Sequence, residues 1–420
     1  MRLLPLLLLP LHLASAGTFF WATDMHVDIW GELGNPSDEI CAWTPSAQLQ
    51  SAVAAMSSID AAPDFILCSG DIVHFPNRNS SDLSKDVVLQ THTAFTDYIR
   101  ASFPSTPLYS ALGNHDLHPS NNWPTNVEDS SWLYSHLSEI WSPFLPASSL
   151  DQLSKTGYYA VDASPTLRII TLNTNYWTVY NTGLPWDTGV AETQFAWLES
   201  ELQRAAADDK RVYINGHHPA VGVHVEGGVE VGGLWPLYQQ RFAMLHQQFA
   251  ASIAASFFGH DHVDETRLVR SCTFESGNPD PDSSSVNSCS GDASGVVYVG
   301  QALTNCHTPA FRAWEYDVAS AALTDYTQYA MKTDEATGEL SWPEQYTWSA
   351  AYDAMADLSP ASWQAEIERM QSNWTAFEAF TERRGVGCDK GDEKCRTFTL
   401  CNYLFGSGHA ELLDCLYSGL

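Results

Sequence analysis

Short apolar runs recur through much of the chain, and most of them end abruptly in polar residues. Runs of this length and sharpness are typical of buried strands. They predict strands at Gly17–Thr23, Asp64–Ser69, Pro107–Leu112, Arg211–Asn215 and Ser252–Phe258, with later strands at Gly295–Gln301 and Ala313–Tyr316.

Helical periodicity fills several of the intervals between these strands. It predicts helices at Ala47–Ile59, Asp86–Ser102 and Glu192–Ala206. In the last of these, Phe195 and Leu202 share one apolar face. Strands that alternate with helices indicate an α/β core.

The C-terminal part of the chain has a different pattern. From about Ser341 the composition shifts to Trp, Ala and Glu, and Ser359-Pro360 is typical of a helix start. Apolar residues then recur at helical spacing, which predicts a core-facing stripe of Trp363, Ile367, Met370, Trp374 and Phe377. We expect a catalytic domain over residues 17–335 and a helical subdomain over residues 336–420.

The N-terminal residues have the order of a secretory signal. Arg2 is followed by a leucine-rich run and then by Ala14-Ser15-Ala16, which predicts a signal peptide over residues 1–16. The run is shorter than the roughly 20 apolar residues of a membrane span. We therefore expect a soluble, secreted protein or one in a lysosome or vacuole lumen, with N-glycosylation sequons at Asn79 and Asn373.

The nine cysteines fit an oxidising compartment. Four of them crowd the C-terminal end, where we expect the local pairs Cys388–Cys395 and Cys401–Cys415. Cys272 and Cys289 bracket a Gly/Pro/Asp/Ser-rich insert and could close it. Cys41, Cys68 and Cys306 then remain, so at least one thiol is unpaired within the chain.

The charge balance narrows the choice of partners. The sequence has 50 Asp and Glu against 20 Lys and Arg, which gives a formal net charge of -30. Such a chain repels polyanions, so a nucleic acid polymer or a long polyphosphate is a poor default partner.

Polar clusters follow directly on the first five predicted strands. They are Asp24-Met25-His26, Gly70-Asp71, Gly113-Asn114-His115-Asp116, Gly216-His217-His218 and Gly259-His260-Asp261-His262. In open α/β sheets, ligands gather where strands end, so these clusters predict one common site. Carboxylates and imidazoles suit zinc or iron, and two divalent ions that share an aspartate can activate water and neutralise a phosphoryl group.

This ordered set resembles the signature of the calcineurin-like metallophosphoesterase superfamily, which reads D-x-H, GD, GNH[D/E], GH and GHxH. The sequence is more closely similar to the acid sphingomyelinase-like phosphodiesterases, without a saposin-like region before Asp24. That likeness rests on 113–116 with Pro119 and Trp123-Pro124, on 258–264 and on 308–312. The resemblance implies a β-sandwich of two mixed sheets flanked by helices, with a C-terminal helical, disulfide-bearing subdomain.

The same resemblance implies the roles of the site residues. Asp24, His26 and His262 would bind one zinc ion, and Asn114, His217 and His260 a second. Asp71 would bridge the two ions, whose shared hydroxide would attack phosphorus. His115 would protonate the leaving group, and Asp116 would hold the His115 ring in position.

Two further histidines stay open at this point. His74 stands three positions after Asp71, where the purple acid phosphatases have an iron-ligating tyrosine, so the resemblance favours zinc over iron. His74 itself is either a residue that contacts phosphate or assists protonation, or a surface or packing residue. His218 is either a hydrogen-bonded structural residue or faces the substrate.

These expectations describe a metal-dependent phosphodiesterase for a small substrate, either a sphingomyelin-type lipid or a nucleotide phosphoester. A lipid substrate would involve transient contact with a lipid surface, and the oligomeric state stays open. One alternative is an endopolyphosphatase of the same superfamily, which the net charge disfavours. A catalytically silent binding protein is the other alternative, although every expected ligand position is filled.

Overall fold

The computed structural model describes residues 16–30, 43–75, 83–183, 189–222, 224–226, 229–270, 273–274, 286–288, 292–384, 388–389, 391–405 and 415. Residues 1–15 of the predicted signal peptide therefore lie outside the described residues. So do Asn79 of the first glycosylation sequon and Cys41, Cys272 and Cys289.

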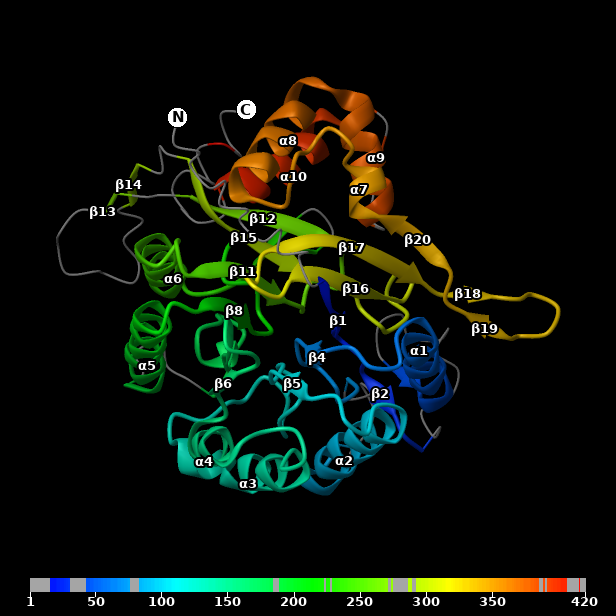
Figure 1. The fold of residues 1–420 in the computed structure, drawn as a ribbon, viewed down its shortest axis with the longest axis vertical. Coiled ribbons are helices and arrows are strands. Elements are labelled where there is room, and N and C mark those ends of the chain that lie inside the picture. The colour runs from blue at the N-terminus through cyan, green and yellow to red at the C-terminus, as the bar shows by residue number, and fades with distance from the viewer. Residues whose placement is uncertain are drawn as a thin grey trace, which may run out of the picture.

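Two six-stranded sheets form the centre of the molecule (Figure 1). The first has the order β20 (Glu344–Thr347), β17 (Leu323–Ala330), β16 (Ala310–Asp317), β1 (Ala16–Ala22), β4 (Phe65–Cys68) and β5 (Leu108–Ser110). The second has the order β12 (Glu265–Arg270), β15 (Ala293–Val299), β11 (Ile253–Phe258), β8 (Arg211–Asn215), β7 (Leu167–Thr171) and β6 (Tyr159–Asp162). Every strand predicted from the sequence is present within three residues of its expected bounds.

Both sheets are mixed, as the resemblance implies. In the first, β1, β4 and β5 are parallel, whereas β16, β17 and β20 pair antiparallel. In the second, β7, β8, β11 and β15 are parallel and the edge strands β6 and β12 are antiparallel. Because β20 belongs to the first sheet, that sheet extends beyond residue 335, the expected end of the catalytic domain.

Aromatic side chains fill the space between the two sheets. Phe19 of β1 lies parallel to Trp314 of β16, with ring centroids 6.1 Å apart. Phe257 of β11 meets Phe19 edge-on at 5.7 Å, and Tyr213 of β8 lies 5.8 Å from it. All four side chains are buried. Such pairs contribute about 0.5–1.5 kcal/mol beyond the burial of their area, so this layer holds the two sheets together.

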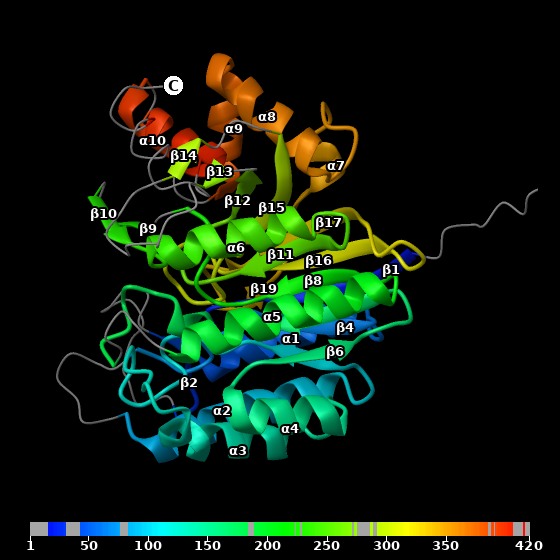
Figure 2. The same ribbon diagram turned by 90° about the vertical axis from the view of Figure 1, so that its left-hand side faces the viewer.

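Helices cover the outer sides of the sandwich, which confirms the α/β class (Figure 2). The helices α1 (Ser46–Ile59), α2 (Lys85–Ser102), α3 (Ser131–Ile140) and α4 (Ala147–Thr156) lie on the side of β4, β5 and β6, and α5 (Gly189–Ala207) and α6 (Pro236–Gln248) cover the second sheet. Short elements complete the chain: η2 (Val127–Ser130), η3 (Thr174–Tyr176), β2 (Val27–Asp28), β3 (Thr44–Pro45), β9 (His224–Glu226), β10 (Val229–Gly232), β13 (Thr273–Phe274), β14 (Val286–Ser288), β18 (Lys332–Thr333) and β19 (Leu340–Ser341).

The C-terminal helices are α7 (Trp348–Ala351), α8 (Pro360–Ser372), α9 (Trp374–Arg384) and α10 (Glu393–Phe405). Among them, α8 and α10 pack on β12 and β15 of the second sheet, α9 packs on α8, and α7 lies against β17 and β20 of the first sheet. The Ser359 hydroxyl caps α8, as the sequence predicts, by accepting from the Ser362 amide. The predicted core-facing stripe is confirmed, since four of its residues are buried in the core and Trp374 packs against it. It is shared by two helices, because Asn373 ends α8 and its Oδ1 accepts from the Ala376 amide in α9. Asparagine favours such capping positions over helix interiors.

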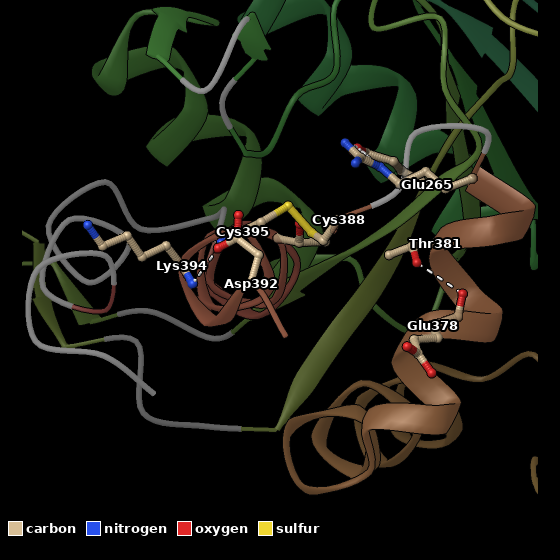
Figure 3. The surroundings of a disulfide bond; sticks show 9 residues. Glu265, Glu378, Thr381, Cys388, Asp392, Lys394 and Cys395 are labelled. Carbon is tan, nitrogen blue, oxygen red and sulfur yellow. Dashed lines mark hydrogen bonds and ion pairs between the residues drawn. A yellow bond between two sulfur atoms is a disulfide. The ribbon is translucent and has the colours of Figure 1, made fainter. Parts of the chain in front are cut away.

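Both predicted C-terminal disulfides are present, Cys388–Cys395 and Cys401–Cys415. Figure 3 shows the first of them at the start of α10. Cys68 is a free, buried thiol, and Cys306 is disulfide-bonded. In the part of the chain that the structure describes, no helix is both long and apolar enough to cross a membrane.

A buried histidine predicts how fold stability depends on pH. The ring of His246 in α6 lies against Gly295 of β15, where a Cβ atom would overlap it, and burial lowers the pKa of His246 from 6.5 to about 4. The unfolded state therefore takes up a proton that the folded state does not. The contribution is complete above pH 6.5 and is lost as the pH falls towards 4, by about 3 kcal/mol.

The His246→Gln variant should lose this pH dependence. Urea unfolding between pH 4 and 7 should give the parent chain a steeper fall in unfolding free energy than the variant. Equal slopes in the two proteins would contradict the assignment to His246.

Candidate metal centre

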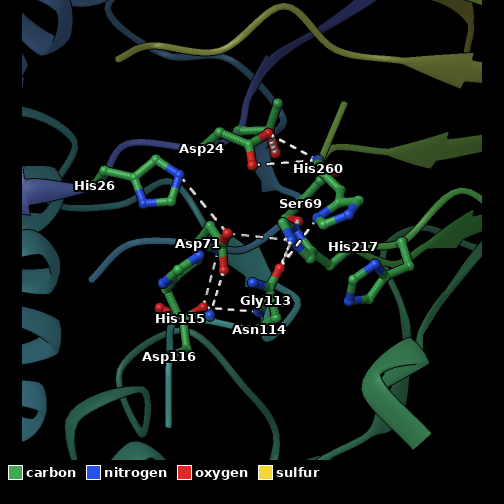
Figure 4. Close-up of polar contacts among 12 residues, drawn as sticks. Asp24, His26, Ser69, Asp71, Gly113, Asn114, His115, Asp116, His217 and His260 are labelled. Carbon is green, nitrogen blue, oxygen red and sulfur yellow. Dashed lines mark hydrogen bonds and ion pairs between the residues drawn. The ribbon is translucent and has the colours of Figure 1, made fainter. Parts of the chain in front are cut away.

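The polar clusters predicted at the strand ends converge on one buried site. Parallel β1, β4 and β5 in the first sheet and β8 and β11 in the second each end at a loop that carries one cluster. Figure 4 shows the side chains of Asp24, His26, Asp71, Asn114, His115, His217 and His260 directed toward one another. The site therefore joins the two sheets at one edge of the sandwich.

Several of these residues have a backbone conformation that side chains other than glycine rarely adopt. Positive φ angles occur at Asp24 (52°), His26 (44°), Asp71 (52°), His260 (70°) and His262 (60°). Each costs on the order of 1–3 kcal/mol and persists only where the surroundings enforce it. Here the Asp24 amide donates to the Gly70 carbonyl and the His26 amide to the Asp71 carbonyl, each at 3.0 Å, which ties the first two loops together.

Two glycines allow these loops to approach closely. A Cβ atom at Gly113 would overlap the carboxylate of Asp71. At Gly259 it would overlap the Thr23 hydroxyl and lie 2.5 Å from Asp24 Oδ2. Glycine at these two positions is therefore a packing requirement of the site.

The first group of candidate ligands is Asp24, His26 and His262. The Nε2 atoms of His26 and His262 are 3.3 Å apart, and His262 Nε2 lies 3.2 Å from Asp24 Oδ1. His26 Nδ1 lies 3.0 Å from the Val73 carbonyl, which can only accept, so Nδ1 carries the proton and Nε2 presents a lone pair to the site. Ligand atoms of all three residues lie within 4.8 Å of one another.

The second group meets at the side-chain oxygen of Asn114. His217 Nε2 lies 2.8 Å from Asn114 Oδ1, and His260 Nδ1 lies 3.1 Å from the same atom. The Ser69 carbonyl, 2.9 Å from His217 Nδ1, fixes the tautomer of His217 as Val73 does for His26. In each group, a backbone carbonyl therefore holds one histidine with its Nε2 atom directed inward.

Asp71 lies between the two groups. Its Oδ2 atom is 3.6 Å from His26 Nε2 and 3.3 Å from His217 Nε2, and its Oδ1 accepts from the His115 amide at 2.8 Å. Burial lowers the pKa of His217, but the nearby Asp71 and Asp24 carboxylates outweigh it and raise the pKa to about 9. A buried set of carboxylates and bare ring nitrogens requires positive charge among its members, so these residues fit a divalent metal centre.

His115 lies beside this set. Its ring centroid is 3.9 Å from that of Phe75 and 5.2 Å from that of His26. Burial lowers the pKa of His115 well below its usual value, and the charges of His217, His262 and His74 add to the effect. Among the described residues, His115 Nδ1 has no hydrogen-bond partner.

Asp116 has partners that differ from the expected one. Its Oδ2 accepts from the amides of Asp71 at 2.9 Å and Gly113 at 2.8 Å. Its Oδ1 accepts from the amides of Ile72 at 2.9 Å and Val73 at 3.1 Å. The carboxylate thus fixes the loop that carries Asp71. Its expected role in orienting the His115 ring stays a prediction.

The other histidines are also placed by the structure. His74 is buried, and its Nδ1 lies 2.7 Å from the Phe75 carbonyl. His218, left open by the sequence, lies with its ring centroid 4.0 Å from that of His260, and His217, His218 and His260 offer ligand atoms within 4.8 Å of one another. Phe75 packs its ring against His26 and His115, and no feature of the sequence indicates this role.

Comparison with known proteins agrees with this geometry. Residues 17–264 match the calcineurin-like phosphoesterase family. The chain belongs to that family. Its members use a divalent metal centre, so the expected class of metal-dependent phosphoric ester hydrolase is confirmed.

This chain is similar over almost its whole length to several relatives of known name. It is 28% identical to acid sphingomyelinase-like phosphodiesterase 3b of Homo sapiens, covering 92% of this chain and 88% of that protein. It is 28% identical to cyclic GMP-AMP phosphodiesterase SMPDL3A of Homo sapiens (96% and 90%) and 27% identical to sphingomyelinase phosphodiesterase C of Dictyostelium discoideum (94% and 92%). The expected likeness to the acid sphingomyelinase-like group is thereby confirmed.

The contacts of Asp116 predict that it acts mainly on stability. In Asp116→Asn, an amide NH₂ group would face backbone N–H donors, and the charge-assisted hydrogen bonds would be lost. We expect the unfolding free energy to fall by about 3 kcal/mol in urea titrations.

The control is Asp151→Asn, which alters an exposed ion pair with Lys155 and should change the unfolding free energy by less than about 0.5 kcal/mol. If Asp116→Asn left stability unchanged and altered only turnover, the role of orienting His115 would be favoured instead.

Proposed function

We propose that this chain hydrolyses a small phosphodiester at a centre of two zinc ions. Asp24, His26 and His262 would hold one ion, with Asn114, His217 and His260 holding the other and Asp71 shared between them. The observation that carries the proposal is the position of Asp71 Oδ2, within 4 Å of the Nε2 atoms of both His26 and His217. Carbonyl groups fix both of these histidines with a lone pair directed at the carboxylate.

When bound, two such ions would neutralise phosphoryl oxygens and lower the pKa of water. Imidazole and carboxylate donors suit zinc, and His74 in place of a tyrosine supports zinc over iron. Asp71 would also hold the loop of Asn114 in place, because its Oδ1 accepts a hydrogen bond from the amide of the next residue, His115.

His115 is our candidate for the proton donor to the leaving group. Its backbone is fixed to Asp71 Oδ1, its ring is next to the ligand His26, and it has no assigned place among the metal ligands. Phe75 covers the ring of His115 and would exclude water from it. A histidine so positioned can protonate an alkoxide as it departs if its ring is itself protonated. The lowered pKa of His115 means that this state is favoured in an acidic medium.

The substrate is proposed from the relatives and from charge. The relatives' names indicate a sphingomyelin-type lipid or a cyclic dinucleotide as the substrate class, and both are phosphodiesters. Among the described residues, Arg267 and Arg312 are bound to carboxylates of the segment that follows His260, and both are buried. Neither is available to bind a polyphosphate chain, which counts against the endopolyphosphatase alternative.

The compartment is part of the same proposal. The signal-like opening of the sequence and the disulfides Cys388–Cys395 and Cys401–Cys415 support passage through the secretory pathway. We therefore infer secretion or residence in a lysosome or vacuole lumen, with Asn373, which is exposed, as a glycosylation site.

A substrate panel tests the function. The zinc-loaded chain should hydrolyse bis-p-nitrophenyl phosphate faster than the monoester p-nitrophenyl phosphate, and it should cleave sphingomyelin vesicles or cyclic GMP-AMP. A chelator should abolish each activity. Phosphate release from polyphosphate alone would favour the endopolyphosphatase, and two bound zinc ions without any hydrolysis would indicate a binding protein.

Variants at His115 and Asp71 separate proton transfer from metal binding. His115→Ala should retain both metal ions and lose about 10²- to 10⁴-fold in kcat, because the leaving group is no longer protonated. Asp71→Asn should instead lower the metal content, because the shared charge is gone. Metal analysis beside initial rates measures both effects.

His136→Ala serves as the control, since His136 bonds Thr93 away from the ligand loops and should keep metal and rate. Unchanged turnover in His115→Ala would remove His115 from the mechanism, and full retention of metal in Asp71→Asn would count against a shared ligand.

A further inference from the structure

The segment that follows His260 carries several acidic residues, and arginines neutralise each of them. Asp261 pairs with Arg267, and Glu265 pairs with both Arg267 and Arg384. Asp264 pairs with Arg312 at 2.6 Å. Asp261 lies between the proposed ligands His260 and His262, so this charge network begins at the metal centre.

Arg267 is the junction of the network. Its Nε and Nη2 atoms donate to Glu265 Oε2 at 2.8 and 2.5 Å, and Nη2 also donates to Asp261 Oδ2. Its Nη1 donates to the Val221 carbonyl at 2.9 Å. Val221 lies in the loop that follows His217. One guanidinium therefore joins two loops that carry proposed metal ligands.

The approach of the His217 loop to this guanidinium is close. Gly222 has a φ of +84°, and a Cβ atom there would lie 2.9 Å from Arg267 Cδ and 2.7 Å from Asn402 Oδ1 of α10. Any other residue would force the loop away from Arg267. Gly222 is therefore required both by its positive φ and by the lack of space for a Cβ atom.

The C-terminal helices complete the network. Arg384 at the end of α9 donates from Nε to Glu265 Oε1 at 2.8 Å, and Figure 3 shows Glu265 beside these helices. The side chains of Arg267 and Glu265 are each 2% exposed. Two arginines thus face two carboxylates in a buried volume. Loss of either partner would leave an uncompensated charge, which is costly in such surroundings.

We propose that Arg267 is a positioning residue of the metal centre, which sets the separation of the His217 loop from the His260–His262 loop. The guanidinium acts through Asp261 and the Val221 carbonyl and touches no proposed ligand side chain. Its planar fork is required, because a lysine ammonium cannot reach the same acceptors in the same geometry. This inference rests on the metal centre proposed above.

A second buried arginine in the same sheet provides a matched control. Arg168 of β7 is bonded to Asp162 at 2.5 Å and to Glu201, and its side chain is 8% exposed. Neither of these carboxylates is adjacent to a proposed ligand. Arg168→Lys should therefore reproduce the structural cost of an arginine-to-lysine change without moving the metal ligands.

The test is a titration of the metal-free full-length chain with Co²⁺, followed by visible absorption, which reports affinity and ligand geometry. Arg267→Lys should weaken Co²⁺ binding by about 10- to 100-fold and alter the absorption bands. Arg168→Lys should bind within about twofold of the parent, as expected where a change does not reach the ligand groups. Urea unfolding of both variants measures the accompanying loss of stability.

Asp261→Asn is a milder variant that keeps the shape of the side chain. It should weaken Co²⁺ binding in the same direction, and the double variant with Arg267→Lys should lose less than the product of the two single effects, because both changes remove one interaction.

The outcomes separate this inference from the proposed function. Parent-like Co²⁺ affinity in Arg267→Lys, equal losses in Arg267→Lys and Arg168→Lys, or multiplicative effects in the double variant would each overturn the role of Arg267. A parent chain that binds no Co²⁺ would instead reject the metal centre itself, and the positioning role with it.

Discussion

The buried carboxylate of Asp71 faces ring nitrogens that present lone pairs, with further carboxylate and amide oxygens close by. Such groups repel one another in a low-dielectric interior unless positive charge lies among them. The pKa of His217 is raised for the same reason, because the negative Asp71 and Asp24 carboxylates favour a positive charge on its ring more than burial disfavours it. Much of the surrounding structure can be understood as the means of holding this unfavourable set together.

Three kinds of constraint do so. Backbone hydrogen bonds join the loop at Asp24 to the loop at Asp71, and both residues have positive φ. The Asp116 carboxylate fixes the Asp71 loop by accepting hydrogen bonds from backbone amides. Arg267 joins the loop after His217 to the loop of His260 and His262 through the Val221 carbonyl and Asp261. The interactions are of different chemical types, yet each ends on a segment that carries a candidate ligand.

The strands and the convergence of the clusters could be predicted from the sequence, because short apolar runs and the polar residues after them are local features. The partners of Asp116 could not, since four amides from two loops meet only in the folded chain. The pairing of Asp261 with Arg267 likewise depends on how the chain turns between them. The helix break at Asn373 could not be predicted because the apolar residues keep their helical spacing on both sides of it. Positive φ at His26 has no signature in the sequence either.

The use of arginine also shapes the substrate side of the site. The chain has 20 Lys and Arg against 50 Asp and Glu, and Arg267, Arg312 and Arg384 are all committed to carboxylates. Within the described residues, the positive charge of these three arginines therefore neutralises carboxylates of the fold itself. If the proposed metal ions are bound, they and a few polar groups would supply the attraction for a substrate there. The proposed substrate, a single phosphodiester, agrees with this arrangement better than a chain of phosphates, each of which would need its own counter-charge.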